Sequence, residues 1–353
     1  MKKMGLILIG IIGIVIIGAI LFYNISMSSV SSVQTPKLFI IEAGTSKKEV
    51  AKNLEKAGLI KSSLALDIYL LFNKNLNLQA GEYELSESMK PEEMIKKFAN
   101  GDIKINTKKV TLLEGKNLED FASTLGSTYD FSKQDFLDVV DNEEFVLSMI
   151  DEHWFIQGEV LKEGIYHPLE GYLYPDTYEF KETVTAKEVA QRLLNRTEEI
   201  LEPYKSEIEA SEYSVHDLLT LASIVEKEAS SKEDRKMAAQ VFYTRLKDNW
   251  SLGSDVTTYY GVHKQMGDTL TIYDILDSNP YNTRLTDGTM NGKLPIGPIC
   301  NVNITSVEAA LHPSDTSYYY FVANVCTGEV FFQKTNDEFL SKVKELQLTC
   351  AQN

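Results

Sequence analysis

The hydrophobic pattern begins with an unbroken apolar run, Met4–Tyr23, that contains no charged residue and follows Lys2 and Lys3. Its 20 residues match the hydrocarbon core of a bilayer, which is roughly 30 Å thick. A cleaved signal peptide is the alternative, but its apolar region usually spans only about 7–15 residues. The pattern therefore predicts one membrane-spanning helix at 4–23. The basic flank places residues 1–3 in the cytoplasm and the rest of the chain outside, as in a single-pass protein of the cell membrane.

Beyond a Ser-rich spacer at 24–36, short strands and helices alternate through residues 37–105. Ser46 is typical of a helix cap, Gly58 of a residue just past a helix end, and Pro91 of a first helical position. The pattern predicts a compact strand–helix–helix–strand unit and one further helix, at Leu38–Ile41, Lys47–Ala57, Ser63–Phe72, Glu82–Leu85 and Glu92–Ala99.

Residues 106–165 repeat this strand-to-helix connection more faintly, with apolar positions at the same offsets after Gly115 as after Gly44. An acidic helix is predicted at Ser132–Met149. From residue 166 to residue 350, long helical periods alternate with loops rich in Pro, Gly and Tyr, which is typical of an α+β domain rather than a regular βαβ series. The predicted elements there are helices at Ala186–Ile200, Ser214–Ala229, Ser231–Lys247 and Ser306–Leu311, and paired strands at Tyr318–Ala323 and Glu329–Phe332.

The helix predicted after Ser214 carries an acid on its apolar face. At about 100° per residue, Glu226 projects into the apolar arc, whereas Glu228 lies about 200° away. A carboxyl group that faces a core loses solvation, so its pKa rises and it can hold a proton near neutral pH. Glu226 is therefore the candidate general acid. The arc consists of Leu218, Leu219, Leu221, Ala222, Val225 and Ala229.

The same position also allows a purely structural role. Glu226 could line a cleft or form an ion pair with Arg235 or Arg245, because ion-pair networks perturb carboxyl groups as active sites do. The helical pattern by itself leaves this alternative open.

Charge and composition narrow the class of partner. Once Lys2 and Lys3 are set aside, 33 basic side chains stand against 51 acidic ones, a balance that repels nucleic acid. The three cysteines, Cys300, Cys326 and Cys350, leave at least one unpaired within the chain, and their spacing does not define a disulfide. The five histidines are scattered and no CxxC or HExxH motif occurs, so the sequence predicts neither a metal nor a cofactor.

Loops crowded with Tyr, Asn, Thr, Asp, Gly and Pro surround Glu226 in the sequence. Aromatic faces stack on sugar rings, while amide and carboxylate groups bind hydroxyls, so such loops suit a carbohydrate. For any single loop, ordinary turns with buried tyrosines are the simpler interpretation. The loops are Glu170–Asp176, Gly253–Asp255 with Tyr259–Gly261, Pro280–Arg284 and Leu294–Pro298.

These segments resemble a known family, the endolytic murein transglycosylases of the MltG, or YceG-like, type. The resemblance covers nearly the whole chain beyond the apolar run, and the motifs occur in the family's order. Departures fall at positions expected in loops: Val256 stands where many members have Pro, Asn301–Asn303 replaces a usual Asn-Pro-Gly, and Glu329 occupies a segment where many members carry His. The shared motifs are EGYLYPDTY at Glu170–Tyr178, LASIVEKE at Leu221–Glu228, SDVTTYYG at Ser254–Gly261, PYNT at Pro280–Thr283, LPIGPI at Leu294–Ile299, AALHP at Ala309–Pro313 and YYYFVA at Tyr318–Ala323.

The resemblance implies a division into a cytoplasmic stub at 1–3, a transmembrane helix at 4–23, a spacer at 24–36, a LysM-like subdomain at 37–105, a connecting subdomain at 106–165 and a catalytic domain at 166–350. It assigns the family's catalytic glutamate to Glu226. It implies glycan strands of peptidoglycan as substrate and cell-wall synthases at the membrane as partners. The loop residues expected to bind substrate are Glu170, Tyr172, Asp176, Ser254, Asp255, Tyr281, Asn282, Thr283 and Gly297.

The implied reaction cleaves the bond between N-acetylmuramic acid and N-acetylglucosamine without water, within nascent strands, and leaves 1,6-anhydro ends. A glycoside hydrolase needs two carboxyl groups, whereas this reaction needs one. Asp255 could serve as a second acid, although its place in a loop favours a loop-holding or substrate-binding role. The alternatives are therefore a hydrolytic muramidase, or an anchored glycan-binding scaffold of cell division that does not cut.

Overall fold

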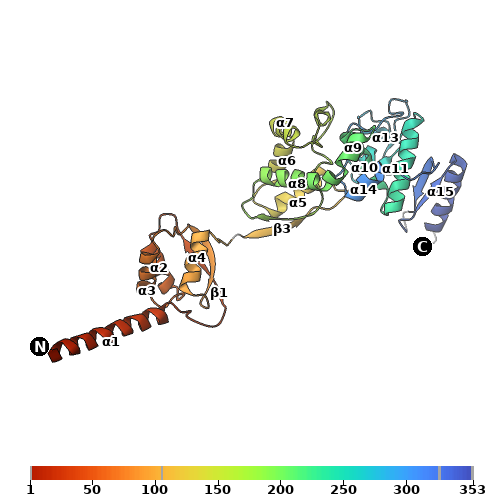
Figure 1. Cartoon of the computed structure of the whole chain (residues 1–353). Coiled ribbons are helices and arrows are strands. Elements are labelled where there is room, and N and C mark those ends of the chain that lie inside the picture. The colour runs from red at the N-terminus through yellow and green to blue at the C-terminus, as the bar shows by residue number, and fades with distance from the viewer. Residues whose placement is uncertain (1, 105, 325–326, 351–353) are drawn as a thin grey trace. The chain divides into compact units, whose positions relative to one another are not determined.

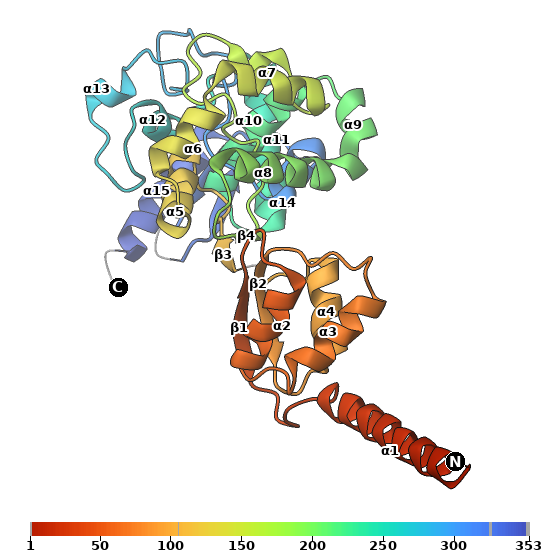
Figure 2. The same cartoon turned by 90° about the vertical axis from the view of Figure 1, so that its left-hand side faces the viewer.

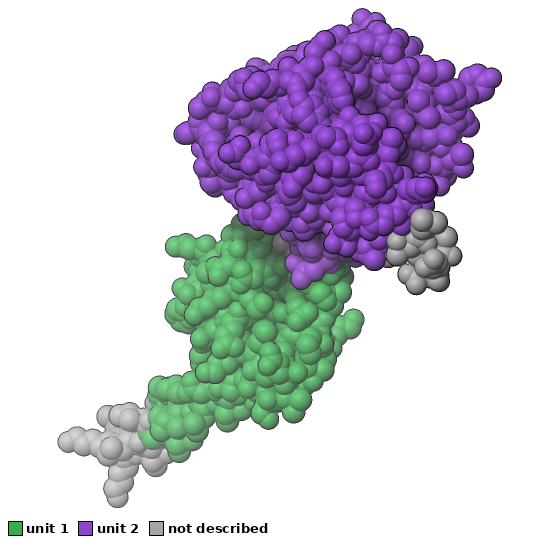
Figure 3. All heavy atoms as spheres, turned by 90° about the vertical axis from the view of Figure 1, so that its right-hand side faces the viewer, with its two compact units in different colours: residues 1–106 green, residues 107–353 purple. Residues whose placement is uncertain are grey.

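The chain forms two compact units, residues 1–106 and 107–353 (Figures 1 and 3). This computed structural model describes the backbone of residues 2–104, 106–324 and 327–350, and the side chains of the same ranges except 2–9 and 348–350. The α+β class predicted from the sequence is confirmed: within these ranges, helices accompany three separate two-stranded antiparallel sheets.

In unit 1, a two-stranded sheet carries its helices on one face (Figure 2). Phe39 and Ile41 are buried while Leu38 and Ile40 are more than half exposed, so the strand presents one face to the helices. The predicted strand–helix–helix–strand order is confirmed: α1 (Lys2–Ser26), β1 (Pro36–Ile41), α2 (Lys47–Lys56), α3 (Ser63–Phe72), β2 (Gly81–Ser86) and α4 (Pro91–Asn100).

Local signals explain where these helices begin and end. The Ser46 side chain accepts a hydrogen bond from the Glu49 N–H at the start of α2, and Pro91 opens α4. Gly101 ends α4 in the left-handed conformation, at φ 72°, which glycine adopts without steric cost.

The apolar run at 4–23 falls within α1. Among the residues whose side chains are described, no helix is long and apolar enough to cross a bilayer. Residues 4–9 of the predicted span lie outside that description, and the membrane-spanning helix expected from the sequence has no support from the structure.

Unit 2 contains the remaining elements and two of the sheets. Strand β3 pairs with β4, Thr111 opposite Thr177, so residues 107–111 pair with a strand that begins at the last two residues of the EGYLYPDTY motif. The elements are β3 (Thr107–Thr111), α5 (Leu118–Thr128), α6 (Lys133–Val140), α7 (Glu143–Glu152), η1 (Gly158–Leu161), β4 (Thr177–Lys181), α8 (Ala186–Leu201), η2 (Glu202–Tyr204), α9 (Lys205–Ala210), α10 (Val215–Glu228), α11 (Lys232–Lys247), α12 (Asp255–Gly261), α13 (Ile272–Ile275), α14 (Ile304–Leu311), β5 (Tyr320–Ala323), β6 (Val330–Gln333) and α15 (Asn336–Cys350).

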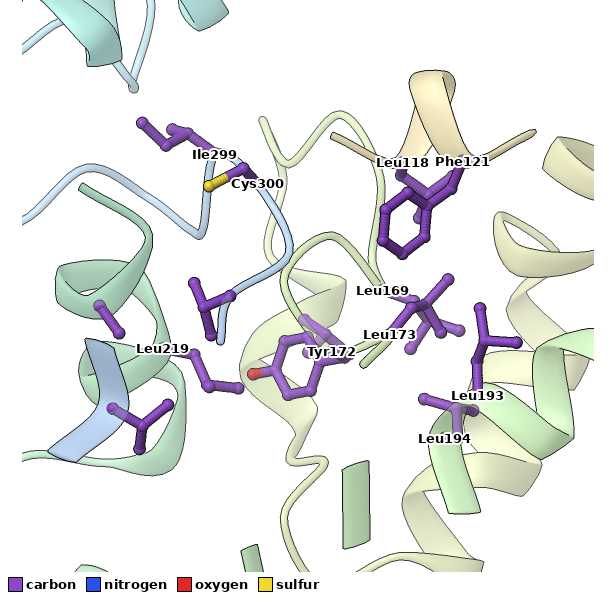
Figure 4. Close-up of a cluster of buried hydrophobic side chains, with 14 of the residues drawn as sticks. Leu118, Phe121, Leu169, Tyr172, Leu173, Leu193, Leu194, Leu219, Ile299 and Cys300 are labelled. Atoms are coloured by element: carbon purple, nitrogen blue, oxygen red, sulfur yellow. The ribbon is translucent and has the colours of Figure 1, made fainter. Parts of the chain in front are cut away.

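A continuous hydrophobic core runs through unit 2, and residues on both sides of position 165 contribute to it. In Figure 4 the ring of Tyr172 points toward Leu219 of α10, while Leu169 and Leu173 lie beside Leu193 and Leu194 of α8. The loop that precedes β4 therefore fills the space between α8 and α10 and fixes both helices relative to each other.

Two predictions in unit 2 are wrong in detail. The helix predicted at Ser132–Met149 is two helices, α6 and α7, because Asn142 caps a new helix by accepting from the Phe145 N–H. The segment Tyr259–Gly261, expected as a loop together with Gly253–Asp255, lies in helix α12, whose polar and aromatic residues have no clear amphipathic period. The strands predicted at Tyr318–Ala323 and Glu329–Phe332 are confirmed as the antiparallel pair β5–β6.

Candidate active site

Helix α10 brings Glu226 to the interior by the mechanism that its sequence predicts. Ser214 and Asp217 form the predicted capping box at its first turn. The predicted apolar residues are all buried, and the Glu226 side chain is only 3% exposed. Ser223 is also buried, and its hydroxyl accepts from the Ile299 N–H and donates to the Thr220 carbonyl.

Three donors surround the Glu226 carboxylate. The Arg235 guanidinium donates to Oε1 at 2.6 Å. The Asn303 backbone N–H at 3.0 Å and the Ser306 hydroxyl at 2.8 Å donate to Oε2. The ion pair with Arg235, which the sequence left open as the structural alternative, is therefore present, and it joins the C-terminal end of α10 to α11 and to the start of α14.

The electrostatic effects on Glu226 oppose one another. Burial raises its pKa, and the hydrogen bond from Ser306, the positive charge of Arg235 and the Asn303 N–H each lower it; the net effect is a raised pKa. The negative charge of Glu114 raises it further. Removal from water thus outweighs three favourable partners, and a raised pKa favours the protonated form that a general acid needs.

The loop that contains Glu114 and Gly115 also lies beside the Glu226 side chain. An added Cβ on Gly115 would lie 3.8 Å from Glu226 Cγ, and the Lys227 ammonium donates to the Gly115 carbonyl at 3.1 Å. The Asn303 side-chain amide donates to Glu114 at 2.7 Å. Glu114 is therefore the acidic residue that shares this part of the structure with Glu226.

Two other acidic residues, Glu228 and Asp255, bind partners other than those of Glu226. Glu228 accepts from the Ser254 hydroxyl at 2.6 Å, as expected for a residue on the far side of α10. Asp255, the second acid suggested by the sequence, is about half exposed and forms an ion pair with Arg284. Neither contacts Glu226 in this arrangement.

Most loop residues expected to bind substrate are enclosed by the protein. Tyr172, Tyr281, Asn282 and Thr283 are no more than 1% exposed. Their polar groups contact the chain: the Tyr172 hydroxyl bonds His216, the Tyr281 hydroxyl accepts from the Tyr166 N–H, the Asn282 amide donates to carbonyls around α13, and the Thr283 hydroxyl accepts from the Ser254 N–H. These side chains fix the loops in this structure.

The remaining four candidates occupy different surroundings. Ser254 is buried against Glu228, and Gly297 lies so close to His216 that an added Cβ would meet its ring at 3.3 Å. Asp176 is partly exposed, at 38%, and pairs with Arg196. Glu170 is fully buried beneath the start of α5. Asp176 and Asp255 are therefore the two members of the set with carboxylates open to solvent.

Sequence reasoning missed Asn303 and Ser306, two of the three groups that donate to Glu226. The available signal was local: Asn303 caps α14, and its side chain accepts from the Thr305 N–H. The position of that helix start beside Glu226 depends on the packing of α14 against α10 and α11.

A hollow of about 1210 Å³ lies at the opposite ends of the same three helices. Its walls include His216, Tyr213 and Asp217 at the start of α10 and Tyr243 near the end of α11. Glu226 does not line this hollow.

The fold and the site together define an α+β protein whose larger unit buries a carboxyl group near the end of a helix, where three hydrogen-bond donors surround it. Comparison with known proteins identifies the family: the sequence profile of the YceG-like family matches residues 39–345. The chain belongs to the YceG-like family.

Two curated relatives are named endolytic murein transglycosylase. The protein from Bacillus subtilis strain 168 is 36% identical over 307 residues, which cover 86% of this chain and 83% of the relative. The protein from Streptococcus pneumoniae strain D39 is 31% identical over 321 residues, covering 86% of this chain and 57% of the relative. A crystal structure of a YceG-like protein from Listeria monocytogenes matches with a TM-score of 0.61 at 36% identity, covering 88% of this chain and 99% of that one.

Proposed function

We propose that this protein is an endolytic peptidoglycan transglycosylase that cleaves glycan strands between N-acetylmuramic acid and N-acetylglucosamine without water. The supporting observation is Glu226, a carboxyl group 3% exposed, with a raised pKa, at the end of a helix in a family whose curated relatives carry that activity in their names.

In this proposal, Glu226 acts first as an acid and then as a base. The protonated carboxyl group gives its proton to the glycosidic oxygen as the bond from that oxygen to C1 of the muramyl residue breaks. The resulting carboxylate takes the proton of the C6 hydroxyl, whose oxygen bonds to C1 and closes a 1,6-anhydro ring. Proton transfer by a positioned side chain typically contributes 10²–10⁴-fold to the rate.

The partners of Glu226 suit both halves of this cycle. Arg235 can only donate, so it favours the carboxylate that remains after the proton has left. The Ser306 hydroxyl can donate or accept, so it can bond either the carboxylate or the protonated acid at Oε2. The three donors occupy three of the roughly four acceptor positions of the carboxylate, so one position remains for the transferred proton.

The one-acid scheme is also supported by the places of the other carboxylates. Glu228 and Asp255 are engaged by Ser254 and Arg284, away from Glu226. A hydrolytic muramidase would need a second carboxyl group across the bond, and Glu114 is the residue near enough to be considered.

The decisive experiment incubates the full-length chain in detergent with uncrosslinked glycan and weighs the products by mass spectrometry. We expect products lighter by one water than those of hydrolysis. Glu226→Gln should abolish them, whereas Asp255→Asn and Glu114→Gln should only weaken cleavage. Products of hydrolytic mass would identify a muramidase, and glycan binding without any cleavage would identify a scaffold.

We also propose that the chain acts at the outer face of the cell membrane, held by residues 4–23, where it cuts strands as synthases release them and so ends their elongation. The support is the uncharged apolar run preceded by Lys2 and Lys3. A chain that starts at residue 30 should fail to shorten glycan strands in cells although it cleaves glycan in solution. Normal strand lengths with that truncated chain would contradict the need for tethering.

A further inference from the structure

We propose that Glu170 is a positioning residue: its buried carboxyl group joins the two loops, residues 115–118 and 301–303, that hold Glu226 in place. It would not contact the glycan. This role goes beyond the proposed reaction and differs from the substrate-binding role expected from the sequence, because Glu170 is 1% exposed.

The Glu170 carboxyl group bonds three separate segments. The Leu118 N–H, at the first turn of α5, donates to both carboxyl oxygens at 3.0 Å. The Tyr260 hydroxyl of α12 donates to Oε2 at 3.1 Å, and the Asn301 amide lies 3.4 Å from Oε1. An acid at this position also interacts favourably with the positive end of α5.

Asn301 continues the connection toward the reaction centre. Its backbone N–H donates to the Lys116 carbonyl and its carbonyl accepts from the Gly115 N–H, both at 2.9 Å, so the two loops pair with each other. Its side-chain oxygen accepts from the backbone N–H groups of Gly171 and Leu173, at 3.1 Å each. The loop that carries Glu170 is thereby tied to the same asparagine.

Both loops contact Glu226. Two residues after Asn301, the Asn303 N–H donates to its carboxylate, and Gly115 lies against its side chain while accepting from Lys227. Displacing either loop moves a hydrogen-bond partner of the proposed acid. Misplacement by about 1 Å of a group in a reaction centre can cost on the order of 10²-fold in rate.

The protonation of Glu170 follows from its surroundings. Burial raises its pKa to about 7, although the Leu118 N–H, the charge of His167 and the Tyr260 hydroxyl favour the carboxylate. Two further titratable neighbours are Tyr281 and Cys300, whose pKa values are raised by burial first and by the charge of Glu170 in addition. The Tyr260 hydroxyl can accept as well as donate, so it can remain bonded when Glu170 is protonated.

The test uses the full-length chain with Glu170→Gln, which keeps the shape but leaves one oxygen as acceptor, and Glu119→Gln as the matched control. Glu119 lies one residue after Leu118 in α5, and its side chain is half exposed. Hydrogen–deuterium exchange is measured in residues 115–118 and 301–303. We expect faster exchange in both segments of Glu170→Gln and no change in the control.

Glycan cleavage supplies the second readout. We expect Glu170→Gln to lower kcat at least about tenfold with little change in KM, because the acid is displaced while the binding surface is not. A parallel loss in Glu119→Gln, or unchanged exchange in Glu170→Gln, would overturn the proposal. If Glu170→Gln does not fold, Tyr260→Phe removes one donor and should accelerate exchange in 115–118 to a smaller extent; unchanged exchange there would overturn it equally.

The two proposals fail separately. If the wild-type chain yields no anhydro product, the proposed function is wrong, yet the exchange measurement still decides whether Glu170 holds the two loops.

Discussion

The two units of this chain bury polar groups very differently. Among the side chains described in unit 1, the buried polar residues are the serines Ser26 and Ser86, and the core is aliphatic and aromatic. Unit 2 buries Glu170, His216 and Arg235, together with the Glu226 side chain, within a core of the same apolar character. Burying a charge costs several kcal/mol unless partners compensate for it. The core of unit 1 therefore carries no such cost, whereas unit 2 carries it at the site where we propose that the reaction takes place.

The largest expected effect separates chemistry from stability within unit 2. Glu226→Gln keeps the size of the side chain but cannot give a proton, so glycan cleavage should fall by about 10²–10⁴-fold or more. The unfolding temperature should also fall, because the buried Arg235 loses its charged partner, so cleavage is measured well below the unfolding transition of the variant. Cleavage at the wild-type rate would remove Glu226 from the mechanism and leave it a structural ion pair.

Removing Arg235, the charged partner of Glu226, should lower the free energy of unfolding more than removing an exposed charged side chain of unit 1. Arg235→Met leaves the buried carboxylate unpaired, which typically costs about 3–5 kcal/mol. The pKa of Glu226 should rise further because the charge of Arg235 lowers it. Urea unfolding followed by a probe in unit 2 checks the first effect, and a shift of the cleavage optimum to higher pH checks the second.

A core substitution in unit 1 provides the contrast. Leu54 is fully buried among apolar side chains, so Leu54→Ala should destabilise unit 1 by about 2–5 kcal/mol. The loss should be the same at pH 6.5 and pH 8, since no ionisable group is involved. A strongly pH-dependent loss would contradict the view that this core is purely apolar.

The smallest expected effect is the pH dependence of unit 2 itself. Glu170 titrates near pH 7 in the folded state and near 4.5 when unfolded, so its contribution to stability is full below 4.5 and is lost as the pH rises through about 7. The raised pKa values of Glu226 and His167 act in the same direction. Burial lowers the pKa of His216, which opposes them only below about pH 6.5.

Between pH 6.5 and pH 8, therefore, the unfolding temperature of unit 2 should fall while that of unit 1 stays constant. Calorimetry of the wild type and of Glu170→Gln checks this, since the variant should lose part of the slope. If the unfolding temperature of unit 2 rose over this pH range, the pH dependence would be opposite to the one expected for buried acids with raised pKa values.

The sequence by itself determined the local features of the protein. The capping box at Ser214, the apolar arc of α10, the cap at Ser231 and the strand–helix–helix–strand order of unit 1 all follow from short-range periodicity and capping. The inward direction of Glu226 followed in the same way, because helical geometry fixes the face on which a residue lies.

Only the tertiary structure decided which groups meet that carboxyl. Arg235, Asn303 and Ser306 come from segments up to 80 residues away, and no periodicity encodes their approach. The same holds for Tyr172, Tyr281 and Glu170, whose polar groups made them candidates for solvent-facing loops and which the fold encloses instead. Residue type tells which hydrogen bonds a side chain can make, but long-range packing decides whether the partner is a ligand or the protein's own backbone.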